Sequence, residues 1–466
     1  MTGIRSEVYP AGINRLWTGY STTQMSDTDP TSPPHDPKLT GRAVMHDWWP
    51  LAISWGLMGL EMPAISIVIG HLPQAEIMLA AFGGIAFPLG LIVESPIIMM
   101  LAASTALSRN YDQFLKLQHF MTIVSIGLTI LHAALAFTPL WTWAVIPLLD
   151  IPTEVQEPSR LAFAWLLPWT WAIADRRFRQ GMLIHFGRRE VIAYGTGIRL
   201  LATVGMLILL AQLGVMGAVV ATASLSTGVI VEAAYVRIRS RPVVAGPLKS
   251  APASDQPLRL TKLLRFYVPL ALTPMLVLAA QPIGAAGMTR MPDALASLAV
   301  WAPLGGIIFL VRSVGIAYNE VVIRLTSKEG SGPVLRRFAW IAGLIFSGVM
   351  LVISLTPLAG IWFQQIVGLK PELAQLGVSV LWLGAPIPLM TFLQSFYQGV
   401  LVDHHRTRPV TESVVIYLGI TILGLGSGIL HGGWVGLIVA ITTYTIANSG
   451  QTLWLYIRAR DLLRTP

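Results

Sequence analysis

The sequence contains no cysteine and few charged residues. The absence of cysteine from 466 residues excludes disulfide bonds, iron–sulfur centres and thiol catalysis. Charged residues make up 12% of the chain, whereas a soluble domain has about 25%. Hydrophobic residues account for 54%, and the mean hydropathy is +0.65. This composition predicts an integral membrane protein.

Motifs of enzymes and pumps are also missing. The chain has no Walker A sequence, no Gly-x-Ser-x-Gly and no His-Glu-x-x-His. We therefore expect neither an enzyme nor an ATP-driven pump in this chain alone, and neither a cofactor nor a metal site. The net charge of +9 is scattered between apolar runs rather than gathered in a basic domain, which argues against a nucleic-acid partner.

The beginning of the chain, residues 1–44, is rich in Pro, Ser, Thr and Asp. It has too little apolar content to pack, so we expect a disordered cytoplasmic tail. It also lacks the apolar core segment of a signal peptide. Met25, at the head of the run MSDTDP, is an alternative start of the chain.

Twelve apolar segments follow, each long enough to cross a bilayer, which takes about 20 apolar residues. Backbone groups have no other partners in hydrocarbon, so we expect all twelve to be helices. The predicted spans are 48–70, 76–106, 116–148, 157–186, 190–212, 215–237, 266–288, 294–325, 334–366, 374–402, 409–430 and 434–457.

Lysine and arginine concentrate in alternate loops. The loops after even-numbered segments and the C-terminal tail carry most of them, whereas the loops after odd-numbered segments hold only Arg160, Arg290 and Lys370. By the positive-inside rule, both termini are cytoplasmic. We expect the protein to reside in the plasma or inner membrane.

The chain repeats itself at an offset of about 219 residues, as where VMGAVVATAS at 215–224 is followed by WVGLIVAITT at 434–443. Each copy has six segments, so both have the same orientation. Such repeats are related by an axis along the membrane normal, with the substrate site between them. The alternative is chance matching of short Gly/Pro motifs. The predicted parts are an N-lobe at 45–237, a linker at 238–262, a C-lobe at 263–457 and a tail at 458–466.

One predicted helix carries charges that a membrane interior disfavours. Each costs at least roughly 2.5–3.5 kcal/mol at that depth. Asp175 and Arg179 are i,i+4 neighbours and can pair. The surplus positive charge needs carboxylates from other helices or an anionic ligand, which arginine binds bidentately. Ligand binding and a structural salt-bridge network both stay open. The charged residues within 161–187 are Asp175, Arg176, Arg177 and Arg179.

Further charges lie midway along other segments. Glu94 and Arg312 fall at nearly the same depth in the second helices of the two repeats. We hypothesise that they face each other across the central cleft in one state; the alternative is that each pairs within its own lobe. Buried carboxylates can also bind and release a proton or bind Na⁺. The candidates for such ion coupling are Glu61, Glu94 and Asp175.

Six plus six helices, with Pro-Leu entering the first helix of each repeat at 50–51 and 269–270, resemble the MATE-like branch of the multidrug/oligosaccharidyl-lipid/polysaccharide exporter (MOP) superfamily. The stretch AAFGGIAFPLGLIVESP at 80–96 is similar to that of the ANK (progressive ankylosis) proteins. The resemblance implies a MATE-like fold and, for the ANK branch, export of anions such as pyrophosphate, citrate or nucleotides. Drug-exporting MATE proteins usually present acidic cavity residues, whereas this chain adds arginines.

We therefore expect an all-α integral membrane protein of two six-helix lobes that acts as a secondary active exporter by alternating access and is monomeric. The expected substrate is a small organic or phosphorylated anion. Three alternatives are a proton- or sodium-coupled cation antiporter using Glu61 and Glu94, a flippase for a lipid-linked sugar, and a non-transporting receptor or scaffold. The expected substrate-binding residues are Arg176, Arg177, Arg179, Arg312 and Glu94.

Overall fold

The computed structural model describes residues 39–252 and 258–463, except 327, 329 and 405. The predicted tail at 1–44, with the alternative start at Met25, lies outside the described residues as far as position 38. The last three residues of the predicted tail at 458–466 also lie outside them.

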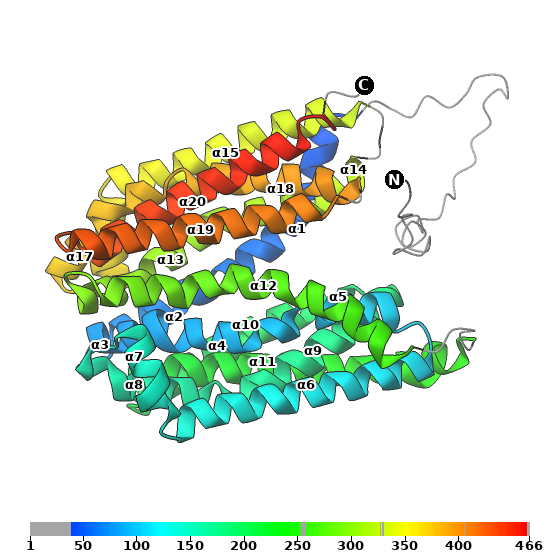
Figure 1. Cartoon of the computed structure of the whole chain (residues 1–466), viewed down its shortest axis with the longest axis horizontal. Coiled ribbons are helices and arrows are strands. Elements are labelled where there is room, and N and C mark those ends of the chain that lie inside the picture. Colours follow the sequence, from blue (N-terminus) through cyan, green and yellow to red (C-terminus); the bar gives the residue numbers. More distant parts are fainter. Residues whose placement is uncertain (1–38, 253–257, 327, 329, 405, 464–466) are drawn as a thin grey trace, which may run out of the picture.

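All regular secondary structure in the described part of the chain is helical, and ten helical segments are long and apolar enough to span a membrane. Two further helical segments, 153–185 and 436–459, are more polar than these ten and lie in the same bundle (Figure 1). The chain is therefore an all-helical integral membrane protein, and each of the twelve predicted spans falls on one of these segments. The ten are Gly41–Gly70, Ala75–Leu107, Tyr111–Phe137, Glu190–Gln212, Gly217–Leu248, Leu260–Thr289, Ala294–Leu325, Ser331–Leu355, Pro371–Asp403 and Arg408–His431.

Several segments consist of consecutive helices, some with a π-helical turn (η2 to η5) or a 3₁₀ turn (η6). In the first half these are α1 (Gly41–Gly59), α2 (Glu61–Gly70), α3 (Ala75–Leu79), η2 (Ala80–Ala86), α4 (Phe87–Ile98), α5 (Met100–Leu107), α6 (Tyr111–Phe137), η3 (Trp141–Val145), α7 (Ile146–Leu149), α8 (Thr153–Trp165), α9 (Leu167–His185), α10 (Glu190–Gln212), α11 (Gly217–Val243) and η4 (Val244–Leu248). In the second half they are α12 (Leu260–Thr289), α13 (Ala294–Ile316), α14 (Tyr318–Leu325), α15 (Ser331–Leu355), α16 (Leu358–Gly360), η5 (Ile361–Ile366), α17 (Pro371–Leu381), η6 (Trp382–Gly384), α18 (Ile387–Asp403), α19 (Arg408–His431) and α20 (Gly436–Ala459).

Proline explains where several helices break. Pro63 has no N–H for the helical ladder, and the first segment is interrupted at Leu60, three residues earlier. This break places Glu61 in the first turn of α2. Pro168 lies in the first turn of α9, where a missing N–H costs nothing, and the break after α8 precedes it.

Three predicted boundaries need correction. The third and ninth spans end at Phe137 and Leu355, earlier than expected, because a Thr-Pro pair follows each and holds its threonine extended, with ψ near 171° at Thr138 and 170° at Thr356. The segment predicted as a linker from 238 is helical as far as Leu248 through α11 and η4. The predicted span was defined by its apolar run alone, and a helix whose charged end extends out of the bilayer continues beyond that run.

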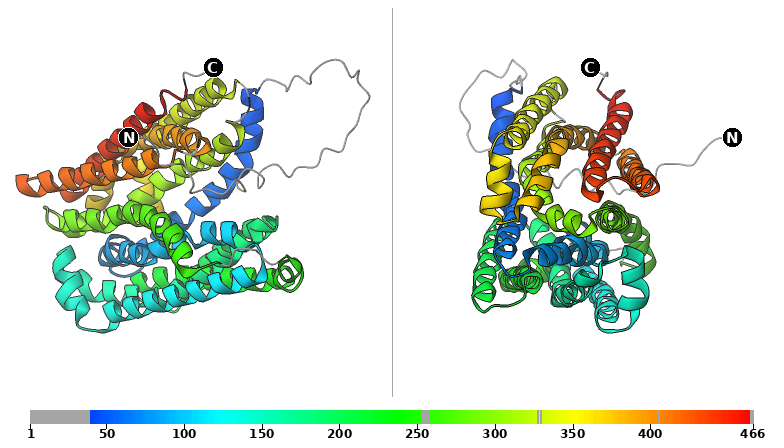
Figure 2. Two further views of the ribbon diagram at one scale, coloured as in Figure 1. Left: turned by 45° about the vertical axis from the view of Figure 1, so that its right-hand side comes forward. Right: turned by 90° about the vertical axis from the view of Figure 1, so that its left-hand side faces the viewer.

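The helices form two groups, the first lobe (α2–α11) and the second lobe (α13–α20). In Figure 1 the first lobe lies below the second. Two helices cross between them. The helix α1 packs on α13, α14 and α15 of the second lobe, and Figure 2 shows it running obliquely from one group to the other. The Trp48 indole donates to the Val314 carbonyl at 2.9 Å, and Asp47 pairs with Arg324.

The first half of α12 makes the reciprocal crossing. It packs on α4 of the first lobe, and the Tyr267 hydroxyl donates to the Pro96 carbonyl. Leu263 and Tyr267 are buried in the same apolar cluster as Phe178 of α9. Each lobe thus holds, by apolar packing, half of a helix that belongs in sequence to the other.

The end of the bundle where α1 begins and α20 ends is here called the terminal end, and the opposite one the distal end. Val44 of α1 and Ala459 of α20 share one apolar cluster at the terminal end. At the distal end the lobes touch directly. Arg290 donates to the Leu148 carbonyl at 2.9 Å, and Lys370 pairs with Glu76 at 3.4 Å. The described conformation is therefore closed at the distal end.

Glycine permits the close approach of the lobes at that end. A Cβ on Gly70 would lie 1.7 Å from the Val367 carbonyl oxygen, and one on Gly83 would lie 2.3 Å from the Ala302 Cβ. Small residues of this kind let membrane helices pack backbone against backbone. A methyl group at Gly70 cannot be accommodated without moving the second lobe or the turn that carries Val367.

We predict that Gly70→Ala opens the distal end. Because the chain has no cysteine, Glu76→Cys and Lys370→Cys introduce its only thiols, which a short bifunctional maleimide should join in the parent protein. Gly70→Ala should strongly reduce this cross-linking. Gly56→Ala, where nothing lies within 4 Å of the added carbon, is the control and should leave it unchanged. Undiminished cross-linking in Gly70→Ala would contradict the prediction.

Candidate functional site

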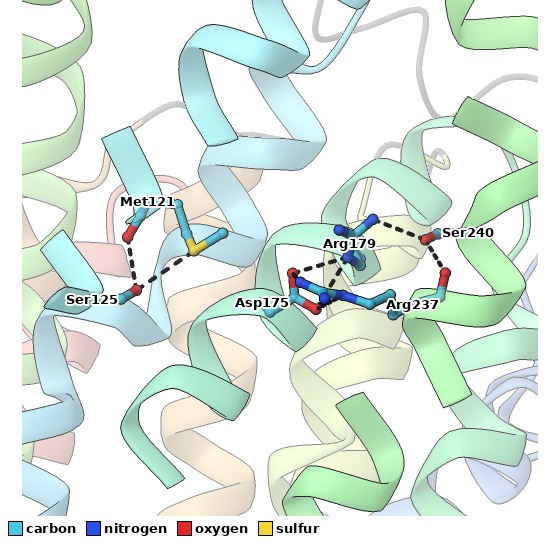
Figure 3. A network of polar contacts seen from close by, with 6 residues as sticks. All are labelled: Met121, Ser125, Asp175, Arg179, Arg237 and Ser240. Carbon is cyan, nitrogen blue, oxygen red and sulfur yellow. Dashed lines mark hydrogen bonds and ion pairs between the residues drawn. The ribbon is translucent and has the colours of Figure 1, made fainter. Parts of the chain in front are cut away.

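The charges of α9 lie on two faces of that helix. Asp175 and Arg179, one turn apart, face the end of α11, as Figure 3 shows. Asp175 accepts hydrogen bonds from Arg179 at 3.0 Å and from Arg237 at 3.1 Å. Arg179 also donates to the Ser240 hydroxyl at 3.2 Å. The expected intrahelical pair is present, and Arg237 completes it.

The second face of α9 points to Glu232 of α11, which is 1% exposed. Arg176 pairs with this carboxylate, and the Gln180 amide donates to it at 3.0 Å. Arg199 of α10 lies 3.8 Å from it and 3.3 Å from Glu61 of α2. Glu61 also accepts from the Thr203 hydroxyl at 3.3 Å. Residues from four helices of the first lobe are thus joined through two carboxylates.

The first-lobe cluster keeps a surplus of positive charge. Three carboxylates face five arginines, so the formal charge is +2. Arg177 lies near Arg176 and Glu232 but forms no ion pair or hydrogen bond with any described residue, and its Nε atom is buried without a partner. Sequence spacing identified the pair on α9. Sequence spacing did not identify Arg237 as a partner, because the pattern of basic residues assigned it to the cytoplasmic loop after the sixth predicted span.

Glu94 and Arg312 are not paired in this conformation. Glu94 is 1% exposed in α4, and neither of its carboxylate oxygens has a hydrogen-bond partner among the described residues. Arg312, in α13, also has no ion pair there, and its buried Nε atom has no partner. Their meeting in another state stays a prediction.

Arg312 lines a cavity of about 490 Å³ in the second lobe. The cavity extends from the middle of α12 to the beginning of α14, the middle of α18 and the terminal halves of α19 and α20, and Trp55 of α1 borders it. Glu320 is the other charged residue of its lining. The Tyr417 hydroxyl is close enough to interact with Arg312. The cavity also presents six side-chain amides, those of Gln281, Asn319, Gln394, Gln398, Asn448 and Gln451.

The i,i+4 spacing of Glu320 and Arg324 indicates a local ion pair, but the structure does not form it. Arg324 pairs instead with Asp47 of α1. Glu320 interacts with the Trp55 indole and lies near Arg189 of the first lobe. The crossing of α1 supplies a partner that the sequence could not place, and it leaves Glu320 at the edge of the cavity.

No protein-family model matches the sequence, and no curated protein is detectably similar to it. Solved structures are similar in fold. The lipid II flippase MurJ in an inward closed conformation has a TM-score of 0.63 at 13% identity, over 88% of this chain and 87% of that one. An inward-facing multidrug resistance MATE family transporter of the MOP superfamily has 0.57 at 14%, over 90% and 95%.

A MOP superfamily transporter from Pyrococcus furiosus is also similar, with a TM-score of 0.53 at 16% identity over 92% of this chain and 98% of that one; reverse polarity of its binding pocket suggests a different function for it. The chain therefore has a MATE-like fold. The narrower resemblance to ANK proteins stays a prediction.

We predict that Glu232→Gln strongly destabilises the first lobe. Removing one partner of a buried ion pair leaves an uncompensated charge and costs about 3–5 kcal/mol. The thermal unfolding midpoint of the purified protein in detergent should therefore fall by several degrees. Asp112→Asn, which removes the carboxylate of the exposed pair with Lys116, is the control and should not shift it. An equal shift in both variants would contradict a structural role for the Glu232 cluster.

Proposed function

We propose that this protein is a secondary transporter that works by alternating access and moves a small organic anion bound at Arg312. The observation that carries the proposal is the position of Arg312. It lies on a membrane-spanning helix, lines a cavity and has no carboxylate partner among the described residues. An arginine stays charged at any accessible pH, and an unpaired one in the membrane is costly. An anionic ligand would remove that cost.

The cavity lining supports the same proposal. A guanidinium group binds a carboxylate or phosphate with two parallel hydrogen bonds. The side-chain amides around it offer donors and acceptors for the remaining oxygens of such a ligand. With one arginine and one glutamate in the lining, the cavity suits a ligand of low charge better than a polyphosphate.

The expected substrate-binding residues of α9 have different surroundings. Arg176 and Arg179 are held by carboxylates, which favours a structural role for both. Arg177 has no such partner, and we propose that it adds to the positive potential met by an anion. Glu94 does not line the cavity. The rival function, a cation antiporter using Glu61 and Glu94, loses support at Glu61, because Arg199 neutralises that carboxylate.

The arrangement of the lobes supports alternating access. The lobes touch at the distal end, and the cavity extends to the terminal halves of α19 and α20. The positive-inside rule places the terminal end in the cytoplasm. On this interpretation the structure represents an inward-facing state. Transport to the other side requires the distal contacts to separate while the terminal end closes over Arg312.

We predict that Arg312→Gln abolishes anion transport. Purified protein in proteoliposomes would be loaded separately with citrate, pyrophosphate, ATP and a cationic dye, and efflux of each measured. Citrate efflux should be lost in Arg312→Gln, because the amide carries no charge to bind the carboxylate.

Lys116→Gln, which removes an exposed positive charge from the first lobe, is the control and should transport as the parent does. Dye efflux that survives Arg312→Gln would contradict the proposal and favour the cation antiporter. Absence of efflux for all four solutes would contradict it in favour of a lipid-linked substrate.

A further inference from the structure

A second cleft, of about 570 Å³, lies at the terminal end of the second lobe, where α19 begins and α20 ends (Figure 1). It shares no lining residue with the cavity around Arg312. Its lining is mostly basic, and the arginines come from two sides: from the turn before α19 and its first residue, and from the end of α20. They are Arg406, Arg408, Arg458 and Arg460.

Two of these arginines share one carboxylate. Glu412, one turn into α19, lies 3.0 Å from Arg408 of the same helix and 3.3 Å from Arg458 of α20. The guanidinium group of Arg458 also lies over the ring of Trp454, 5.6 Å from its centroid. An aromatic face attracts a cation in this position. Arg458 is therefore held in place before any ligand arrives, and Glu412 neutralises only one of the two charges.

The other two arginines of the cleft have weaker partners or none. Arg460 lies 3.7 Å from the carboxylate of Asp461, and both side chains are well exposed, so this pair contributes little. The Arg406 side chain forms neither a hydrogen bond nor an ion pair with any described residue. In this part of the described chain, four arginines face two carboxylates, which leaves a formal charge of +2.

The cleft lies where the exposed side chains of α19 and α20 change from apolar to basic. On α20, Leu453, Ile457 and Arg460 follow one another at intervals of one turn, and all three are exposed. On α19, Val415 is exposed one turn beyond Glu412. Neither Leu453 nor Val415 lines the cavity around Arg312. In a membrane-spanning bundle, exposed apolar side chains of this kind contact acyl chains.

We infer that this cleft binds the phosphate group of an anionic phospholipid, whose acyl chains lie along the exposed apolar side chains of α19 and α20. A guanidinium group binds phosphate oxygens with two parallel hydrogen bonds. The surplus positive charge disfavours a headgroup that carries its own cation, such as choline. By the positive-inside rule the cleft faces the cytoplasmic leaflet, whose surface is negatively charged.

The position of the cleft gives the lipid a structural role. The helices α19 and α20 pack side by side, and the Gln451 amide donates to the Ser413 hydroxyl at 3.4 Å between them. The same two helices contribute Tyr417 and Gln451 to the cavity around Arg312. A phosphate bound by arginines of both helices would hold the beginning of α19 against the end of α20. Lipid binding itself does not depend on the proposed transport function.

Native mass spectrometry of the purified full chain tests the site by titration with two lipids that have identical acyl chains. Phosphatidylglycerol should bind the parent more tightly than phosphatidylcholine does. Arg406→Gln/Arg460→Gln should weaken phosphatidylglycerol binding by about tenfold, because two basic residues near the headgroup are lost. Neither residue pairs with Glu412, so the contact between α19 and α20 stays intact. Equal phosphatidylglycerol binding by parent and variant would overturn the inference.

A matched control removes two charges elsewhere at the same end of the second lobe. Arg336→Gln/Arg337→Gln, at exposed positions near the beginning of α15, should bind phosphatidylglycerol as the parent does. An equal loss in this variant would mean that general surface charge attracts the lipid, and would overturn the assignment to the cleft. Asp461→Asn decides the matter if the cleft variant does not fold. It removes an exposed carboxylate from the lining and should tighten phosphatidylglycerol binding; unchanged or weaker binding would overturn the inference.

A soluble phosphate ester could supply the same chemistry, and a competition arm distinguishes this source from a lipid. Glycerol 3-phosphate carries the phosphate without acyl chains. If the lipid is the ligand, a large excess of glycerol 3-phosphate should leave most of the phosphatidylglycerol bound, because the apolar contacts hold the acyl chains. Displacement at a concentration equal to that of the lipid would overturn the lipid assignment and identify a site for a soluble phosphate.

Discussion

The cost of a charge inside the bilayer is the constraint on which the rest of this structure depends. Five arginines and three carboxylates from α2, α9, α10 and α11 meet in the first lobe, and the geometry of those four helices follows from the need to bring the charges within hydrogen-bonding distance. Removal of Glu232 would leave both Arg176 and Arg199 without their shared carboxylate. The cluster therefore fixes the relative positions of the four helices and offsets part of their positive charge.

The buried charged side chains that have no partner of opposite charge among the described residues are the groups of interest for transport. Arg177, Arg312 and Glu94 have no ion-pair partner among the described residues, and they are distributed over both lobes. Arg312 lies in a cavity, where a ligand can supply the missing charge. Glu94 lies in a closed interior, where it has no hydrogen-bond partner among the described residues.

The fold could be predicted largely from sequence, because the lengths and apolarity of the segments are local properties. The Asp175–Arg179 pair could be predicted for the same reason, because helical periodicity alone brings side chains four residues apart together. The remaining partners depend on which helices are neighbours. Arg324 binds Asp47 rather than Glu320 because α1 crosses to the second lobe, and no spacing within α14 could indicate that. The surroundings of Glu94 and Arg312 likewise depend on side chains distant in sequence.

The exchange of half-helices between the lobes has a consequence for how this protein assembles. The beginning of α1 completes the packing of the second lobe, and the beginning of α12 completes that of the first. Neither half of the chain therefore contains a whole folding unit. The first six segments emerge from the ribosome with α1 lacking its binding surface in the second lobe, and the face of α4 that packs on α12 stays uncovered until the seventh segment is synthesised. Maturation is consequently a property of the full chain: membrane insertion can proceed segment by segment, but tertiary packing must wait for the second repeat.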